Sequence, residues 1–170
     1  MTEPHHGQPV LAELFRHNLW ANLSLIDLCL TLPEEILETN VPGTYGGIRE
    51  TLTHLVGAEE RYLLAFAGGL ERLQPSLEET APDLATVRER ARRSGERFIT
   101  YAGTVEGNPT LDVIWHGQSY KVPAAFYFVQ ALNHATEHRT QIKTALTQAG
   151  ISPPELDGWT WDDERRGPAR

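Results

Sequence analysis

Four long segments with apolar residues at helical spacing constrain the fold of this chain most strongly. In each segment apolar side chains recur every three or four positions, so each helix would carry one apolar face. The segments span residues 9–31, 47–67, 83–101 and 123–150. Helices of this kind bury their apolar faces against one another. We therefore predict the all-α class and a four-helix bundle, as a single domain over residues 1–170 in which about 1–8 and 163–170 are flexible.

The remaining segments connect or follow these helices. The link over residues 68–82 is long for a helix hairpin, where about 2–8 residues are usual, so it can carry the chain along the whole bundle. Within residues 104–122 apolar and polar residues alternate before a Gly, which predicts a short irregular hairpin. The tail contains Trp159 and Trp161, which we expect to dock on the helices or on a partner.

Composition excludes several classes of protein. The 170 residues carry a formal net charge of −8, which disfavours binding along a nucleic-acid backbone. Cys29 is the only cysteine, so the chain forms no internal disulfide and suits a reducing compartment. The first residues lack a signal-peptide pattern, and no apolar run approaches the roughly 20 residues that cross a bilayer. We predict a cytoplasmic protein without a membrane or nucleic-acid partner.

A pair of histidines one helical turn apart, His134 and His138, lies in the fourth helical segment. Side chains at positions i and i+4 project from the same side of a helix, so both imidazoles can bind one metal ion. His54 lies on the second helical segment, beside small residues such as Ala58 that leave room for its ring. We predict these three histidines as ligands of one metal ion.

Three histidines are more typical of a catalytic than of a structural metal site. Structural zinc sites usually close four ligands, often with thiolates, whereas three protein ligands leave one position open. Zinc, nickel, iron and manganese all accept imidazole, so the sequence predicts one divalent metal ion without choosing among them. The alternative is that the histidines are ordinary surface or core residues.

Two other metal patterns compete with this interpretation. Residues 134–138 also read H-x-x-E-H, the inverted zincin pattern, in which Glu137 would be the general base of a metalloprotease. Such peptidases are much larger mixed α/β chains with a further ligand downstream, and little chain follows His138. A di-iron carboxylate bundle needs paired Glu-x-x-His motifs on its helices, and the four helical segments contain none.

The chain resembles the DinB/YfiT-like family over nearly its whole length. A first similar segment is FRHNLWANLSLIDLCLTLP. A second is GGIRETLTHLVGAEERYLLAF, where a histidine precedes an Ala-Glu pair and an aromatic residue. The third is NHATEHRTQIKTALTQAG, with H-x-x-x-H followed by a Gln-Ile pair and a helix-ending Gly. The second and third segments together carry most of the resemblance.

This resemblance implies both an architecture and a chemistry. It implies a bundle of up-down-down-up topology, in which the 68–82 link is the long crossover between the second and third helices. It implies a metal held by His54, His134 and His138, and a homodimer. Characterised members of the family include metal-dependent transferases that use low-molecular-weight thiols such as bacillithiol, and a mycothiol-dependent isomerase.

Three function hypotheses follow. The leading one is a metal-dependent enzyme that transfers a low-molecular-weight thiol cosubstrate onto a small electrophilic substrate, with the open metal position holding the sulfur as thiolate. The second is a hydrolase that uses metal-bound water. The third is a non-catalytic metal or small-ligand binding module.

Three polar residues are further candidates for catalytic roles. Glu59 falls inside an apolar stripe, where an unpaired charge is costly. It either accepts a hydrogen bond from a ligand histidine or forms a buried ion pair with Arg61 or Arg139. Gln141 either binds a metal-bound water or substrate, or is a solvated helix residue. Glu137 is either a catalytic group or solvent-facing.

Other residues receive simpler interpretations. Cys29 has apolar neighbours and is predicted to be core, because free cysteine is often buried. His116 either lines the rim of the pocket or occupies a turn, and His17 is either packed or exposed on the first helix. Candidates for recognising an acidic cosubstrate are Arg49, Arg61 and Arg139.

Overall fold

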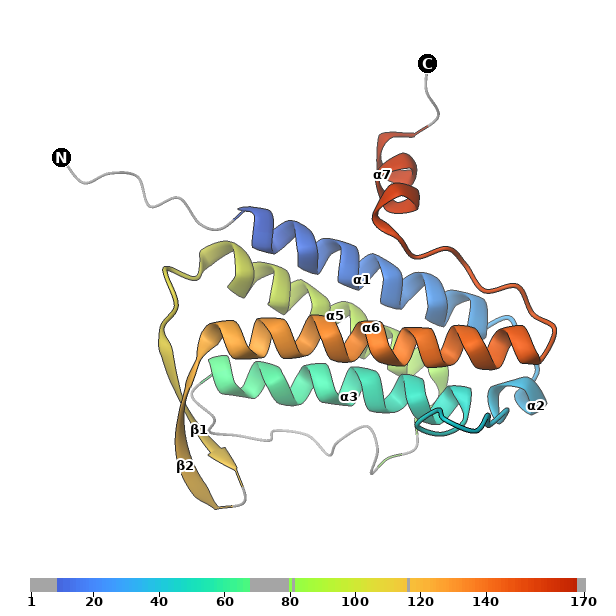
Figure 1. Cartoon of the computed structure of the whole chain (residues 1–170), viewed down its shortest axis with the longest axis horizontal. Helices are drawn as coiled ribbons and strands as arrows, with labels where there is room; N and C mark the ends of the chain where they lie inside the picture. The colour runs from blue at the N-terminus through green and yellow to red at the C-terminus, as the bar shows by residue number, and fades with distance from the viewer. Residues whose placement is uncertain (1–8, 68–79, 81, 116, 168–170) are drawn as a thin grey trace.

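The computed structural model of this chain describes residues 9–67, 80, 82–115 and 117–167, and within them it is mostly helical (Figure 1). Its elements in chain order are α1 (Pro9–Cys29), α2 (Glu34–Leu37), α3 (Ile48–Phe66), α5 (Leu84–Thr104), β1 (Thr110–Trp115), β2 (Gln118–Pro123), α6 (Ala124–Gln148) and α7 (Gly158–Arg166). The long helices α1, α3, α5 and α6 coincide with the four predicted segments, and their ends differ from the predicted ends by only a few residues.

The four long helices lie side by side. Helices α1 and α6 run in one direction and α3 and α5 in the other (Figure 1). Both α1 and α3 contact α5 and α6, so each long helix packs on two others. The predicted crossover over residues 68–82 falls almost entirely outside the described residues. None of the helices in the described part of the chain combines the length and the hydropathy needed to span a membrane.

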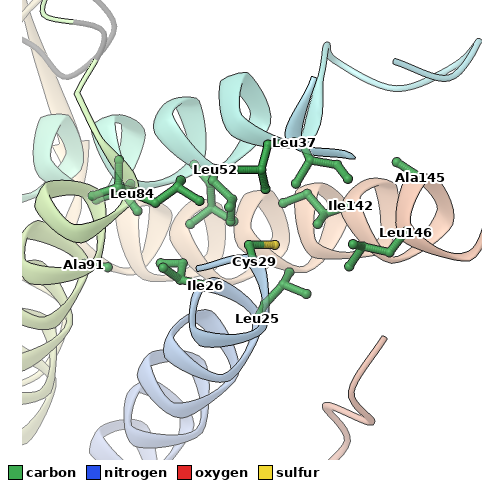
Figure 2. Close-up of a cluster of buried hydrophobic side chains, with 14 of the residues drawn as sticks. Leu25, Ile26, Cys29, Leu37, Leu52, Leu84, Ala91, Ile142, Ala145 and Leu146 are labelled. Carbon is green, nitrogen blue, oxygen red and sulfur yellow. The ribbon is translucent and has the colours of Figure 1, made fainter. Parts of the chain in front are cut away.

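Two apolar clusters fill the space between the helices. The first lies near α2, where Leu25 from α1, Leu52 from α3 and Ile142 from α6 meet (Figure 2). The second lies toward the other end of the long helices and is rich in aromatic rings. Phe15 stacks on Phe98 with ring centroids 4.8 Å apart. Burial of such rings is a major contribution to core stability.

Cys29 lies in the first cluster and is fully buried, as predicted. Burial raises the pKa of its thiol to about 12, and only the thiolate reacts with disulfide reagents. At pH 8 we expect the folded protein to hold on the order of 1,000-fold less thiolate at Cys29 than an ordinary cysteine holds. Ellman's reagent should therefore modify Cys29 rapidly in urea and very slowly in native buffer. Equal rates in the two conditions would contradict this assignment.

The all-α class is wrong in one respect, because β1 and β2 form a two-stranded antiparallel sheet. The strands pair from Thr110 opposite Pro123 to Trp115 opposite Gln118. Gly117 between them has a φ of +76°, which glycine adopts without strain. The short hairpin predicted here is therefore confirmed, and it is regular. Its inward-facing Val113 is buried, so the period-two pattern has a packing role.

Helix α7 was not predicted as a helix. The side chain of Asp157 accepts a hydrogen bond of 2.8 Å from the backbone N–H of Thr160 and so caps its start. Residues 163–166, which we expected to be flexible, form its end, where Arg166 pairs with Asp162 at 2.7 Å. Favourable charges in the last turn stabilise this end of the helix.

Helix α7 is held against α1 by polar and aromatic contacts. The Nε1–H of Trp20 donates to Glu164 at 2.8 Å, and the ring of Trp161 meets His17 edge-on at 5.6 Å. Trp159 is 82% exposed. The expected docking on the helices therefore applies to Trp161 and not to Trp159.

Candidate metal centre

The three predicted ligands come together between two adjacent helices. Helix α3 carries His54, and the neighbouring helix α6 carries His134 and His138. The Nε2 atom of His134 lies 3.2 Å from Nε2 of His54 and 3.1 Å from Nε2 of His138. One ligand nitrogen from each residue lies within 4.8 Å of the others. The three imidazole rings are therefore brought together by the helical spacing within α6 and by the packing of α3 on α6.

These separations suit a metal ion bound by imidazole. Two nitrogens that bind a tetrahedral zinc ion at about 2.0–2.1 Å lie about 3.3 Å from each other. The two closest pairs of nitrogens, at 3.1 and 3.2 Å, are near that value. The three histidines can therefore hold one divalent metal ion.

Burial keeps the central histidine of the group neutral. His134 is partly buried, and this burial is the largest cause that lowers its pKa to about 4, followed by the charges of His138, His54 and Arg61. Only a neutral imidazole binds a metal. At pH 7 His134 is therefore in its ligand form.

Tyrosine rings flank the histidines on both sides. The ring of Tyr45, in the loop before α3, stacks on His54 with centroids 3.9 Å apart and planes 19° apart. The ring of Tyr62 meets His134 edge-on at 5.8 Å, and its hydroxyl accepts a hydrogen bond from Gln130 at 3.3 Å. These two aromatic rings pack against the histidines and cover part of their surface.

Gln141 contacts both His138 and the loop that carries Tyr45. Its Oε1 accepts a hydrogen bond from the backbone N–H of Tyr45 at 3.1 Å and lies 3.0 Å from Nδ1 of His138. An amide oxygen only accepts, so Nδ1 of His138 must carry the proton. In the neutral form of the ring, the lone pair is then on Nε2, which faces His134. Gln141 is therefore not a purely solvated helix residue, because its side-chain oxygen is engaged by both His138 and Tyr45.

Glu59 belongs to a separate buried network. Its carboxylate accepts hydrogen bonds from Asn18 at 2.7 Å, Asn22 at 3.0 Å and Ser94 at 2.9 Å. The same two asparagines accept hydrogen bonds from Arg139, each at 2.6 Å. Glu59 is thus connected to Arg139 through two side-chain amides. This arrangement is closer to the predicted buried ion pair with Arg139 than to the predicted hydrogen bond with a histidine of the metal site.

Burial acts on both charges of this network. Loss of solvation raises the pKa of Glu59, against the opposing effect of its three donors and of Arg139. Loss of solvation lowers the pKa of Arg139 to about 10.

The interpretation of the sequence did not include Asn22, although this residue lies four positions after Asn18 and therefore on the same face of α1. Two adjacent polar residues on a buried face predict a buried polar partner.

The structure places the other candidates away from the three histidines or at the surface. Glu137 is exposed on α6. Arg49 pairs with Glu34 and Glu38. The Nε2–H of His17 donates to the carbonyl of Leu156 at 2.9 Å. His116 lies outside the described residues.

Together, the helical fold and the three-histidine group define a helical protein with a site able to hold a metal ion. The chain belongs to the DinB family, whose sequence model, described as "DinB family", matches residues 1–167. It is also similar to a protein of Bacillus subtilis (strain 168) named "Protein DinB". The two sequences are 24% identical over 159 residues, which cover 85% of this chain and 89% of that protein. These comparisons confirm the resemblance stated from the sequence.

Proposed function

We propose that this chain is a metal-dependent enzyme of the DinB type that transfers a low-molecular-weight thiol onto a small electrophile. The observation that carries the proposal is the convergence of His54, His134 and His138 on one point through their Nε2 atoms. Three protein ligands leave an open coordination position. A divalent metal bound there would lower the pKa of a thiol and keep it as a nucleophilic thiolate.

The surrounding residues support this chemistry. Gln141 keeps Nε2 of His138 available as a ligand, and the rings of Tyr45 and Tyr62 shield the histidines from bulk water. In the transfer, the sulfur forms a bond to the electrophilic carbon, the thiol proton goes to solvent, and the leaving group departs with its electron pair. Because Tyr62 accepts a hydrogen bond from Gln130, its own hydroxyl proton can be donated to substrate.

Several finer assignments belong to the same proposal. We propose that the metal is zinc, nickel, iron or manganese, that residues 1–170 form one domain, and that the four long helices are a bundle of up-down-down-up order. The single cysteine supports a cytoplasmic location, and the family resemblance supports a homodimer. Exposed apolar side chains at the start of α6, Phe126 and Val129, are compatible with burial against a second copy.

The experiment measures thiol consumption by the purified chain. Free thiol is followed with glutathione, cysteine or coenzyme A and with 1-chloro-2,4-dinitrobenzene, after loading with each candidate metal. We expect turnover that requires metal and falls to the background rate in His54→Ala. The exposed Glu137→Gln is the matched control and should retain the activity. An absence of metal-dependent turnover with every thiol and electrophile would remove the transferase proposal.

Two other outcomes identify the alternatives. Metal-dependent cleavage of a nitrophenyl ester without added thiol, at a rate that rises as bound water ionises, would indicate a hydrolase. Tight metal binding with neither activity would indicate a binding module. Both results would replace thiol transfer and leave the metal site intact.

A further inference from the structure

One side chain, Gln141, is connected to two of the three histidines. Its contact with His138 is direct, through Oε1 and the Nδ1–H at 3.0 Å. Its contact with His54 runs through Tyr45, because the same Oε1 accepts the Tyr45 backbone N–H at 3.1 Å. The ring of Tyr45 in turn stacks on His54 at 3.9 Å and meets His138 edge-on at 5.5 Å.

The hydrogen-bond partners of Gln141 determine which atom of its side-chain amide is the oxygen. A backbone N–H only donates, so the atom of Gln141 that faces Tyr45 must be its oxygen. That oxygen can accept two hydrogen bonds, and the second comes from Nδ1 of His138. Leucine has a similar size at this position but offers no acceptor, so it would remove both hydrogen bonds together.

The loop that carries Tyr45 is anchored on either side of this residue, by Val41 in the first apolar cluster and by Gly46, whose carbonyl accepts from Thr51. Tyr45 itself is held from α6 by Gln141. Tyr45 is about half exposed and follows Gly43, whose φ is +92°. Immediately before α3 come Gly46 and Gly47. The hydroxyl of Thr44 hydrogen-bonds within the loop, to the carbonyls of Val41 and Gly46. A glycine-rich segment has a large conformational freedom to lose, so a hydrogen bond from α6 has a clear ordering effect on it.

We propose that Gln141 is a positioning residue that fixes His138 directly and His54 through the Tyr45 loop, so that both rings are oriented before a metal arrives. The inference rests on the metal site of the proposed function and adds a specific residue to it. Hydrogen-bond partners of ligand histidines set ring orientation, and their loss typically costs about 10–100-fold in metal affinity. Stacking by Tyr45 adds a smaller contribution.

The test compares zinc affinity among four proteins, measured by competition with a chelating indicator. For Gln141→Leu we expect a Kd about 10–100-fold weaker than that of the unchanged chain. For Tyr45→Ala we expect a Kd roughly two- to tenfold weaker, the loss of one aromatic pair. The matched control is Gln148→Leu, the same change at an exposed position of the same helix, and it should bind zinc as before.

A second measurement separates positioning from a general loss of structure. Amide hydrogen exchange of the metal-free proteins, followed by NMR, reports the Tyr45 N–H directly. It should exchange slowly in the unchanged chain and rapidly in Gln141→Leu, while amides in the middle of α3 and α6 stay protected in both. Unfolding of the helices in this variant would appear as loss of that protection. In that case the zinc affinity of Tyr45→Ala, in which Gln141 is unchanged, provides the test instead.

The outcomes distinguish this inference from the proposed function. Zinc affinity within about twofold of the unchanged chain in both variants would overturn the positioning role and leave the metal site standing. Equal Tyr45 exchange rates in the unchanged chain and in Gln141→Leu would overturn it as well. If the unchanged chain bound no zinc, nickel, iron or manganese, the proposed function would fail first, and this inference with it.

Discussion

Replacement of Glu59 by alanine is expected to lower the free energy of unfolding by about 3–5 kcal/mol, because it breaks a buried charge pair from one side. Glu59 is fully buried and accepts three hydrogen bonds. Its removal leaves the buried charge of Arg139 without a compensating carboxylate. The amide donors of Asn18 and Asn22 also lose their acceptor, which adds a desolvation cost. Urea unfolding followed by circular dichroism measures the change.

The neighbouring Glu60 supplies a matched control. It pairs with Arg90 in a partly buried position that still reaches solvent, so Glu60→Ala should lower the free energy of unfolding clearly less than Glu59→Ala does. A double-mutant cycle of Glu59→Ala and Arg139→Ala should show a coupling of about 0.5–3 kcal/mol. If the two single effects simply add, the asparagine-bridged pair does not behave as one unit.

Replacement of His134 by alanine is expected to abolish the stabilisation that metal confers. A ligand that binds only the folded state, present at 100 times its Kd, raises the free energy of unfolding by about 2.7 kcal/mol. His134 is the central histidine of the group, because its Nε2 lies 3.2 Å from Nε2 of His54 and 3.1 Å from Nε2 of His138. The unchanged chain should therefore melt at a higher temperature when zinc is added, and His134→Ala should not.

His17→Ala is the matched control for this variant. It also removes a partly buried histidine on a long helix, but one that is bound to the Leu156 carbonyl and packed against α7. It should lose some stability without metal and keep the full zinc-dependent increase. Metal analysis should give about one ion per chain for His17→Ala. A zinc-dependent increase that survives in His134→Ala would place the metal elsewhere.

The parts of the fold that were predicted correctly are those with long apolar periodicity. The period of α3 and α6 was sufficient to place His54, His134 and His138 on faces that can meet, since an i, i+4 pair shares a side of a helix. The period alone did not show that α3 and α6 are neighbours. That statement came from the family resemblance, and the structure agrees with it.

The parts that were missed depend on contacts between distant residues. Tyr45 lies in a loop without periodicity, and only the fold brings it onto His54 and beside Gln141. Helix α7 is short and polar, so its start depends on the cap at Asp157 and its packing on Trp161. Short elements of this kind are set by tertiary contacts more than by propensity.

The two buried asparagines of α1 also determine how the helices are aligned along their length. Asn18 and Asn22 each donate to Glu59 on α3 and accept from Arg139 on α6. Sliding α1 by one residue, about 1.5 Å, would break all four hydrogen bonds at once, whereas apolar contacts tolerate small slips. Because α3 and α6 also carry the three imidazoles, this inner polar layer fixes the axial alignment of the two helices on which the candidate metal site is built.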